Sequence, residues 1–139
     1  MIQNDTTNGQ SLKAIKAKES QEQEAQLRAK CEQLAKEKYG EEQVVKWSNA
    51  NKGLFFLPIL DSEDAIEKLA ILKPINRNIL SYASTKLADE GLYSFLEVIL
   101  KELWIEGDRE IIDEDEYFIP AANKLNKILD SKKAALLKR

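Results

Sequence analysis

The chain has 139 residues, of which 43% are hydrophobic and 32% are charged, as is typical of one soluble globular domain with a charged surface. It contains no histidine, so catalysis and zinc binding that depend on an imidazole are excluded. Its net charge of −3 disfavours nucleic acid and anionic membranes as partners. The single cysteine, Cys31, cannot form an internal disulfide or a CxxC metal site. We therefore expect no enzymatic activity, no cofactor and no metal centre.

No stretch of the sequence resembles a membrane or export segment. The longest uncharged apolar run, residues 54–60, is far shorter than the roughly 20 residues that span a bilayer. Residues 1–10 lack the basic residues and the apolar core of a signal peptide. With one free cysteine, these features favour a reducing cytoplasm.

Residues 1–40 are expected to form an extension with a disordered tip and a charged helical arm. The tip, residues 1–10, is rich in Asn, Thr and Gln. Ser11 can cap a helix over residues 12–39, and Gly40 can end that helix.

Residues 12–42 carry seven acidic and seven basic side chains, but the apolar stripe of the arm is thin. Leu27, Cys31 and Leu34 follow one another at spacings of four and three. One interpretation is a solvated helix held by charge pairs four residues apart. The other is an arm that pairs with another chain through these three side chains.

The pattern changes to strand-like segments after the arm. Residues 44–47 (VVKW) and 54–60 (LFFLPIL) are both predicted as strands, with a turn between them. Pro58 cannot donate to a sheet ladder, so its strand is expected at an edge or at a bulge. Residues 61–74 fit a short helix and a turn followed by a returning strand equally well.

Three helices are predicted in the remainder, over residues 76–88, 92–106 and 114–137. The second has a broad apolar face that recurs at helical spacing up to Trp104, and it is expected to form the centre of the core. Pro120 is expected to start the last helix or to kink it. Residues 41–139 are thus predicted to form a small globular domain, and the fold class is predicted as α+β, mostly α.

Residues 101–116 contain eight carboxylates. They could bind Ca²⁺ or Mg²⁺ and support a small metal-dependent enzyme, but the spacing of an EF-hand loop is absent. The stronger interpretation is structural, because acidic residues before the last helix and basic residues at its end complement the helix dipole. The basic residues of that helix have no interleaved aromatics for stacking on bases, which favours a solvated face.

From residue 54 onward the chain resembles the tail assembly chaperone family of tailed phages. The resemblance rests on Leu72-Lys73-Pro74 with Arg77, on residues 103–108 (LWIEGD) with Glu110-Ile111, and on the acidic turn 113–116. Tyr117-Phe118 and a closing amphipathic helix through residues 132–136 complete it. The chain departs from the family at Leu103, where the family has Cys, and at Glu106-Gly107, where the family has two glycines. The resemblance favours a β-hairpin over residues 54–73.

What the resemblance implies is a non-enzymatic chaperone that coats the helical, aggregation-prone tape measure protein in the bacterial host cytoplasm. The alternative is a structural virion or adapter protein, present in the particle and docked through its N-terminal arm. Either function needs a protein partner, and a second copy of the chain is a further partner; nucleic acid and membrane are not expected. The candidate partner-binding residues are Leu92, Leu96, Leu100, Trp104, Phe118, Leu27 and Leu34.

Overall fold

A computed structural model describes residues 2–130 and 134–139, with side chains from residue 12 onward. The chain divides into two compact units, Met1–Glu41 and Glu42–Arg139, each of which is described by itself. Across the described residues there are six helices and one antiparallel sheet of three strands. The predicted fold class, α+β and mostly α, is confirmed.

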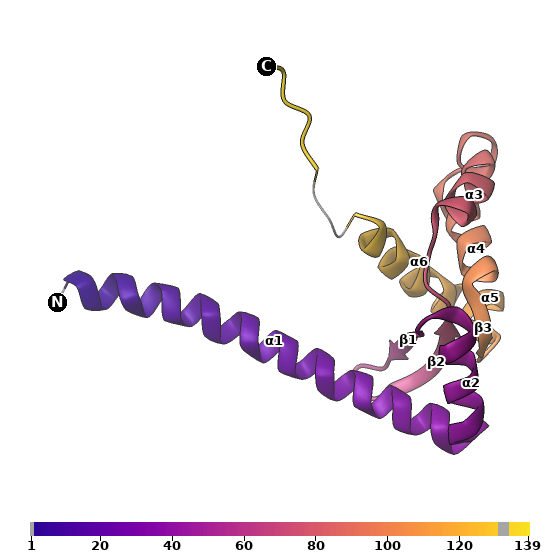
Figure 1. Ribbon diagram of the computed structural model, residues 1–139, viewed down its shortest axis with the longest axis horizontal. Helices are drawn as coiled ribbons and strands as arrows, with labels where there is room; N and C mark the ends of the chain where they lie inside the picture. The colour runs from indigo at the N-terminus through magenta and orange to yellow at the C-terminus, as the bar shows by residue number, and fades with distance from the viewer. Residues whose placement is uncertain (1, 131–133) are drawn as a thin grey trace. The chain divides into compact units, whose positions relative to one another are not determined.

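The first unit is a single helix, α1 (Ile2–Tyr39), which Figure 1 draws without interruption. The predicted disordered tip at residues 1–10 is therefore wrong from Ile2 onward, and Ser11 is not a cap. No proline occurs in this stretch, and a formed helix extends at little cost for each added residue. Gly9 weakens the helix by about 1 kcal/mol but does not block its hydrogen bonds. The predicted end at Gly40 is confirmed, since its φ is 91° and its N–H donates to the Lys36 carbonyl at 2.9 Å.

A helix, α2 (Glu41–Asn51), stands where a strand was predicted at residues 44–47. Val44 is buried, Val45 is exposed and Trp47 is half-buried, so the buried positions recur three residues apart. This spacing is that of a helix face, whereas the two adjacent valines alone favour a strand. The Asn51 side chain donates to the Trp47 carbonyl at 2.8 Å near the end of α2.

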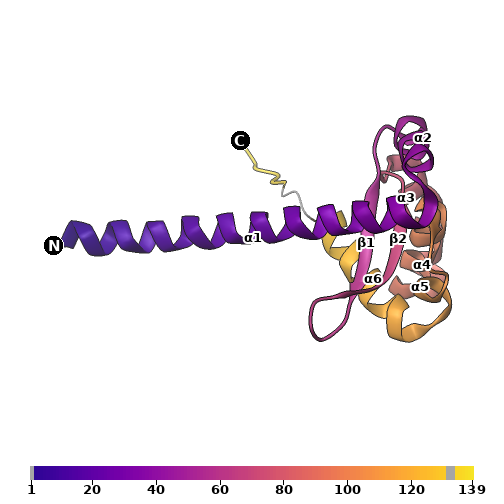
Figure 2. The same cartoon turned by 90° about the horizontal axis from the view of Figure 1, so that it is seen from below.

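The predicted hairpin is confirmed. It consists of β1 (Phe55–Leu60) and β2 (Ile66–Leu72), which pair antiparallel and lie side by side in Figure 2. The alternative of a short helix over residues 61–74 is wrong. Asp61 shapes the connecting turn, because its carboxylate accepts from the amides of Glu63 at 2.8 Å and Ala65 at 3.0 Å.

A third strand, β3 (Trp104–Gly107), lies where the sequence predicted the end of the helix over residues 92–106. The helix itself, α4 (Leu92–Leu103), ends at the residue before Trp104. Trp104 continues the helical spacing of apolar residues, but its backbone is extended and lies opposite Leu72 in the sheet. Pairing with β2 outweighs the helical pattern here, since aromatic and β-branched residues suit a strand.

The remaining helices are α3 (Arg77–Glu90), α5 (Glu110–Asp113) and α6 (Asp115–Leu129). Pro120 lies inside α6, which begins at Asp115, so the prediction that Pro120 starts this helix is wrong. The predicted extent to residue 137 is wrong, because α6 ends at Leu129 and residues 134–139 are not helical. Residues 131–133 of that prediction lie outside the described part of the chain. Leu136 is fully exposed, so no packing stabilises a further turn of helix there.

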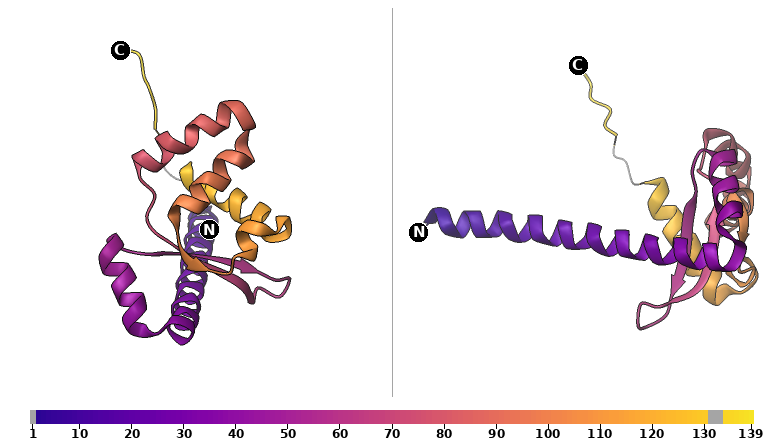
Figure 3. Two further views of the ribbon diagram at one scale, coloured as in Figure 1. Left: turned by 90° about the vertical axis from the view of Figure 1, so that its right-hand side faces the viewer. Right: turned by 60° about the horizontal axis from the view of Figure 1, so that its bottom comes forward.

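The core of the second unit lies between one face of the sheet and helices α3 to α6. In the left panel of Figure 3, α3, α4 and α6 lie on the same side of the hairpin. As predicted, α4 is central: Leu96, Ile99 and Leu100 have no exposed surface. The sheet contributes side chains that alternate along its strands, and α6 covers α4 from the other side. The core residues of the sheet and of α6 are Leu57, Ile59, Ala70, Leu72, Ala121, Ala122 and Leu125.

We predict that Gly107→Ala destabilises the fold far more than Gly91→Ala. Both glycines have positive φ, 153° and 93°. A Cβ at position 107 would lie 2.6 Å from the Leu69 carbonyl oxygen and 2.7 Å from the Ala70 Cα, whereas one at position 91 meets nothing within 4 Å. Backbone strain alone costs about 1–2 kcal/mol at Gly91, and the added clash raises the cost at Gly107 to about 4 kcal/mol. Urea denaturation measures the free energy of unfolding of both variants. An equal decrease in the two variants would contradict the close packing of β3 on β2.

Candidate protein-binding surface

Apolar side chains are exposed where α3 turns into α4. Leu87 is 46% exposed at the end of α3, and Leu92 and Tyr93 are 40% and 46% exposed at the start of α4. Gly91 joins the helices, and its N–H donates to the Leu87 carbonyl at 3.2 Å. Its φ of 93° with ψ of −178° is a conformation that glycine adopts far more easily than other residues. The turn therefore brings these three side chains to one corner of the unit.

Phe118 of α6 packs beside Tyr93 of α4 and so belongs to the same group of apolar side chains. Its ring meets the Tyr93 ring edge-on, with centroids 6.5 Å apart and planes at 61°. The Tyr93 hydroxyl donates to Asn123 Oδ1 at 2.9 Å, which fixes the ring against α6. We call Leu87, Leu92, Tyr93 and Phe118 the α3–α4 corner. It presents apolar area together with a polar tyrosine tip, a combination common in protein interfaces.

Helix α3 is held loosely compared with α4. Among its side chains only Ala83 is buried, while Ile79 and Leu80 are half-buried and Tyr82 is exposed. Its main neighbour is α4, with which it forms a helical hairpin. Asn76 caps its start by accepting from the Ile79 amide at 3.0 Å. Few buried apolar contacts indicate a segment that opens at low free-energy cost.

The structure divides the partner-binding residues expected from the sequence. Leu92 is exposed and Phe118 is half-buried, and both belong to the α3–α4 corner. Leu96 and Leu100 lie on the same helix stripe as Leu92, but they are fully buried in the core and offer no surface. The remaining three are half-buried: Trp104 lies in β3, with the Arg109 guanidinium 5.8 Å from its ring, and Leu27 and Leu34 lie on α1.

Sequence reasoning missed Leu87 and Tyr93. The signal that could have found them is their position on either side of the Asp89-Glu90-Gly91 turn. Helix ends have fewer neighbours than helix centres, so apolar residues that flank a turn are more exposed than those at the middle of the same stripe. The stripe predicted the buried side of α4 correctly but not the point along it at which burial stops.

The acidic stretch before α6 has structural contacts. The Asp108 carboxylate accepts from the Leu69 amide at 2.9 Å, and the Asp108 N–H donates to the Leu69 carbonyl at 3.0 Å. Asp115 and Glu116 occupy the first turn of α6, where carboxylates stabilise the helix dipole. Within residues 12–130 and 134–139 no three carboxylates or cysteines gather in an arrangement that could hold a metal ion.

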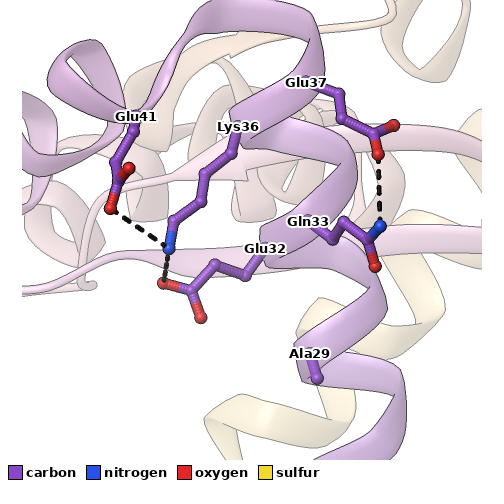
Figure 4. Close-up of a pocket in the computed structure, with 6 residues that line it drawn as sticks. All are labelled: Ala29, Glu32, Gln33, Lys36, Glu37 and Glu41. Carbon is purple, nitrogen blue, oxygen red and sulfur yellow. Dashed lines mark hydrogen bonds and ion pairs between the residues drawn. The ribbon is translucent and has the colours of Figure 1, made fainter.

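A polar hollow lies along α1, lined by Ala29, Glu32, Gln33, Lys36, Glu37 and Glu41 (Figure 4). Its side chains already pair with one another. Lys36 Nζ lies 3.6 Å from Glu32 and 3.8 Å from Glu41, and the Gln33 side chain donates to Glu37 at 3.2 Å. These are the charge and amide pairs that stabilise an exposed helix, and Ala29 is the sole apolar residue of the lining.

Cys31 has the environment of a structural thiol. Burial raises its pKa from 9.0 to about 11, so very little thiolate forms near neutral pH. In the described helices no segment combines the length and the hydropathy that a membrane crossing requires.

No protein-family model, curated protein or solved structure matches this chain. The resemblance to tail assembly chaperones therefore stays a prediction.

We predict that one of the four tyrosines titrates late. The Tyr117 hydroxyl donates to Glu67 Oε1 at 2.9 Å, and this hydrogen bond, with nearby carboxylates, raises the pKa of Tyr117 from 10.0 to about 12. The folded chain favours the neutral phenol, so this contribution to stability is complete below pH 10 and is lost as the pH rises through 12. Phenolate absorbance should show the late step in the wild type and lose it in Tyr117→Phe. A wild type whose tyrosines all titrate near pH 10 would contradict the hydrogen bond.

Proposed function

We propose that this chain is a non-enzymatic protein-binding protein that holds an amphipathic helix of a partner on the α3–α4 corner. The observation that carries the proposal is the exposure of Leu87, Leu92 and Tyr93 on adjacent helix ends. Exposed apolar side chains gathered at one place mark interaction sites, whereas single scattered ones do not. An amphipathic helix is the natural occupant, since its apolar residues recur at three and four positions and can reach all of these side chains.

Charge at the corner indicates the chemistry of the bound helix. Asp89 and Glu90 lie in the turn between Leu87 and Leu92, and both are exposed. Glu90 pairs with Lys86 at 3.3 Å, which neutralises one of the two carboxylates. A partner helix with lysine or arginine beside its apolar face would complement the remaining acidic charge.

We further propose that the partner is a phage tape measure protein and that the chain acts as a tail assembly chaperone in the host cytoplasm. The support is the resemblance from residue 54 onward, in which the LWIEGD segment spans the strand that closes the sheet. Gly107 and Asp108 of this segment both contact Leu69, so the motif residues serve the fold rather than a chemical step. A long helical partner of loosely defined sequence suits this corner, because the corner would recognise only the spacing of apolar residues along a helix.

Co-expression with the tape measure protein of the same phage tests this proposal. We expect a complex that stays in the supernatant and co-elutes in size-exclusion chromatography. A tape measure protein that precipitates equally with and without this chain, with no complex eluting, would overturn the proposal.

We predict that the double variant Leu87→Glu/Leu92→Glu binds the partner at least about tenfold more weakly, because two carboxylates would be placed in the apolar contact. Both side chains are exposed and neither belongs to the core, so the melting temperature should change little. Val45→Glu is the matched control, since Val45 is 48% exposed on α2 and lies outside the corner. Isothermal titration calorimetry of the variants checks the result. Equal affinity in the double variant and the wild type would place the binding surface elsewhere.

A second function, a structural virion or adapter protein docked through its arm, is favoured by α1. Leu12 and Ile15 are 58% and 50% exposed on this helix, three residues apart and therefore on neighbouring positions of one face. Mass spectrometry of purified particles separates the two functions. A virion component is retained at a fixed copy number and is lost from particles in Leu12→Lys/Ile15→Lys, whereas a chaperone is absent from mature particles.

A further inference from the structure

Strand β1 forms an outer edge of the sheet, because the strand order is β1-β2-β3 and β1 pairs with β2 alone among the described strands. Its sequence, FFLPIL, has no charged residue, and Phe55 and Leu60 are exposed at its two ends. An apolar edge strand of this kind is a template for pairing with a second copy of itself. Charged side chains, the common protection of such an edge, are absent from this strand.

Hydrogen bonds on β2 establish which way Pro58 faces. Leu69 turns its N–H and its C=O toward β3, where both meet Asp108. Successive residues of a strand turn these groups to opposite edges, so Lys68 and Ala70 turn theirs toward β1. They lie opposite Ile59 and Leu57, while Pro58 lies opposite Leu69 between these two bonded pairs. The backbone nitrogen and carbonyl of Pro58 therefore face away from the sheet.

The hairpin turn gives the same orientation independently. The Asp61 N–H donates to the Ala65 carbonyl at 2.9 Å, so Asp61 turns toward the second half of the hairpin. Counting back along β1, Ile59 and Leu57 turn the same way, and Leu60, Pro58 and Phe56 turn outward. Pro58 is thus the middle one of these outward-facing residues and lacks the N–H that a pairing strand would need.

We propose that Pro58 closes the outer edge of β1 to a second copy of this chain. Two β1 strands paired antiparallel about a two-fold axis at Pro58 would place the two prolines opposite each other. That central pair would form neither of its hydrogen bonds, and two carbonyl groups would remain without donors. If the two strands shift by two residues, each Pro58 lies opposite a different residue of the other strand. Each of these two pairs then lacks one hydrogen bond. At the strength of an ordinary net hydrogen bond, the loss of two bonds weakens edge pairing by roughly thirtyfold.

Replacing Pro58 with a strand-forming residue that has an N–H tests the proposal. Sedimentation velocity over a concentration series should show Pro58→Val self-associating at least about tenfold more tightly than the wild type. Hydrogen exchange should show the Phe56 and Leu60 amides becoming protected in that variant at high concentration and losing the protection on dilution. The matched control, Pro58→Val/Leu60→Lys, places a charge on the same edge and should return to the wild-type mass.

Two results for Pro58→Val would overturn the proposal: a mass equal to that of the wild type at every concentration, or association that leaves the Phe56 and Leu60 amides unprotected. The wild type provides a test that does not depend on any variant folding. Its Leu57 and Ile59 amides should exchange slowly and its Phe56 and Leu60 amides rapidly, even at the highest concentration. Concentration-dependent protection of Phe56 and Leu60 in the wild type would mean that the edge is already in use.

Discussion

Asp108 holds β3 against β2 through two hydrogen bonds to one residue. Its N–H donates to the Leu69 carbonyl at 3.0 Å, and its carboxylate accepts from the Leu69 amide at 2.9 Å. The contact is possible because Gly107 has no side chain where the Leu69 carbonyl approaches. Together with the pairing of β3 and β2, it fixes the path of the chain from α4 to α5 and α6, and these helices together build the core over the sheet.

The corner proposed to bind a partner follows from this arrangement. With α4 anchored at its C-terminal end by β3 and covered by α6, its centre is fully buried. Its first turn lies at the junction with the lightly packed α3, where the Tyr93 ring packs against Phe118 of α6. Leu92 is therefore exposed although it continues the stripe that forms the core, and Tyr93 is exposed beside it. The same fold leaves β1 at the edge of the sheet, where Pro58 takes the place of a protective charge.

Local signals in the sequence predicted much of this fold and little of the surface. Gly40 marked the end of α1 and Pro58 marked an edge strand correctly, because each acts through its own backbone. The predictions at Trp104 and Val44 were wrong, because the conformation of each residue depends on contacts that the sequence does not reveal. Trp104 pairs with β2, and Val44 packs as part of a helix face. Exposure along α4 was beyond prediction for the same reason, because it depends on where α6 crosses.

The central claim is that the chain acts through an apolar surface at the α3–α4 corner. Its most direct test is to titrate an isotope-labelled full-length chain with a basic amphipathic helix from the tape measure protein and follow backbone amide chemical shifts. If the partner helix binds at this corner, the shifts should concentrate at Leu87, Leu92, Tyr93 and Phe118. Shifts confined to α1, or the absence of any saturable change, would contradict it.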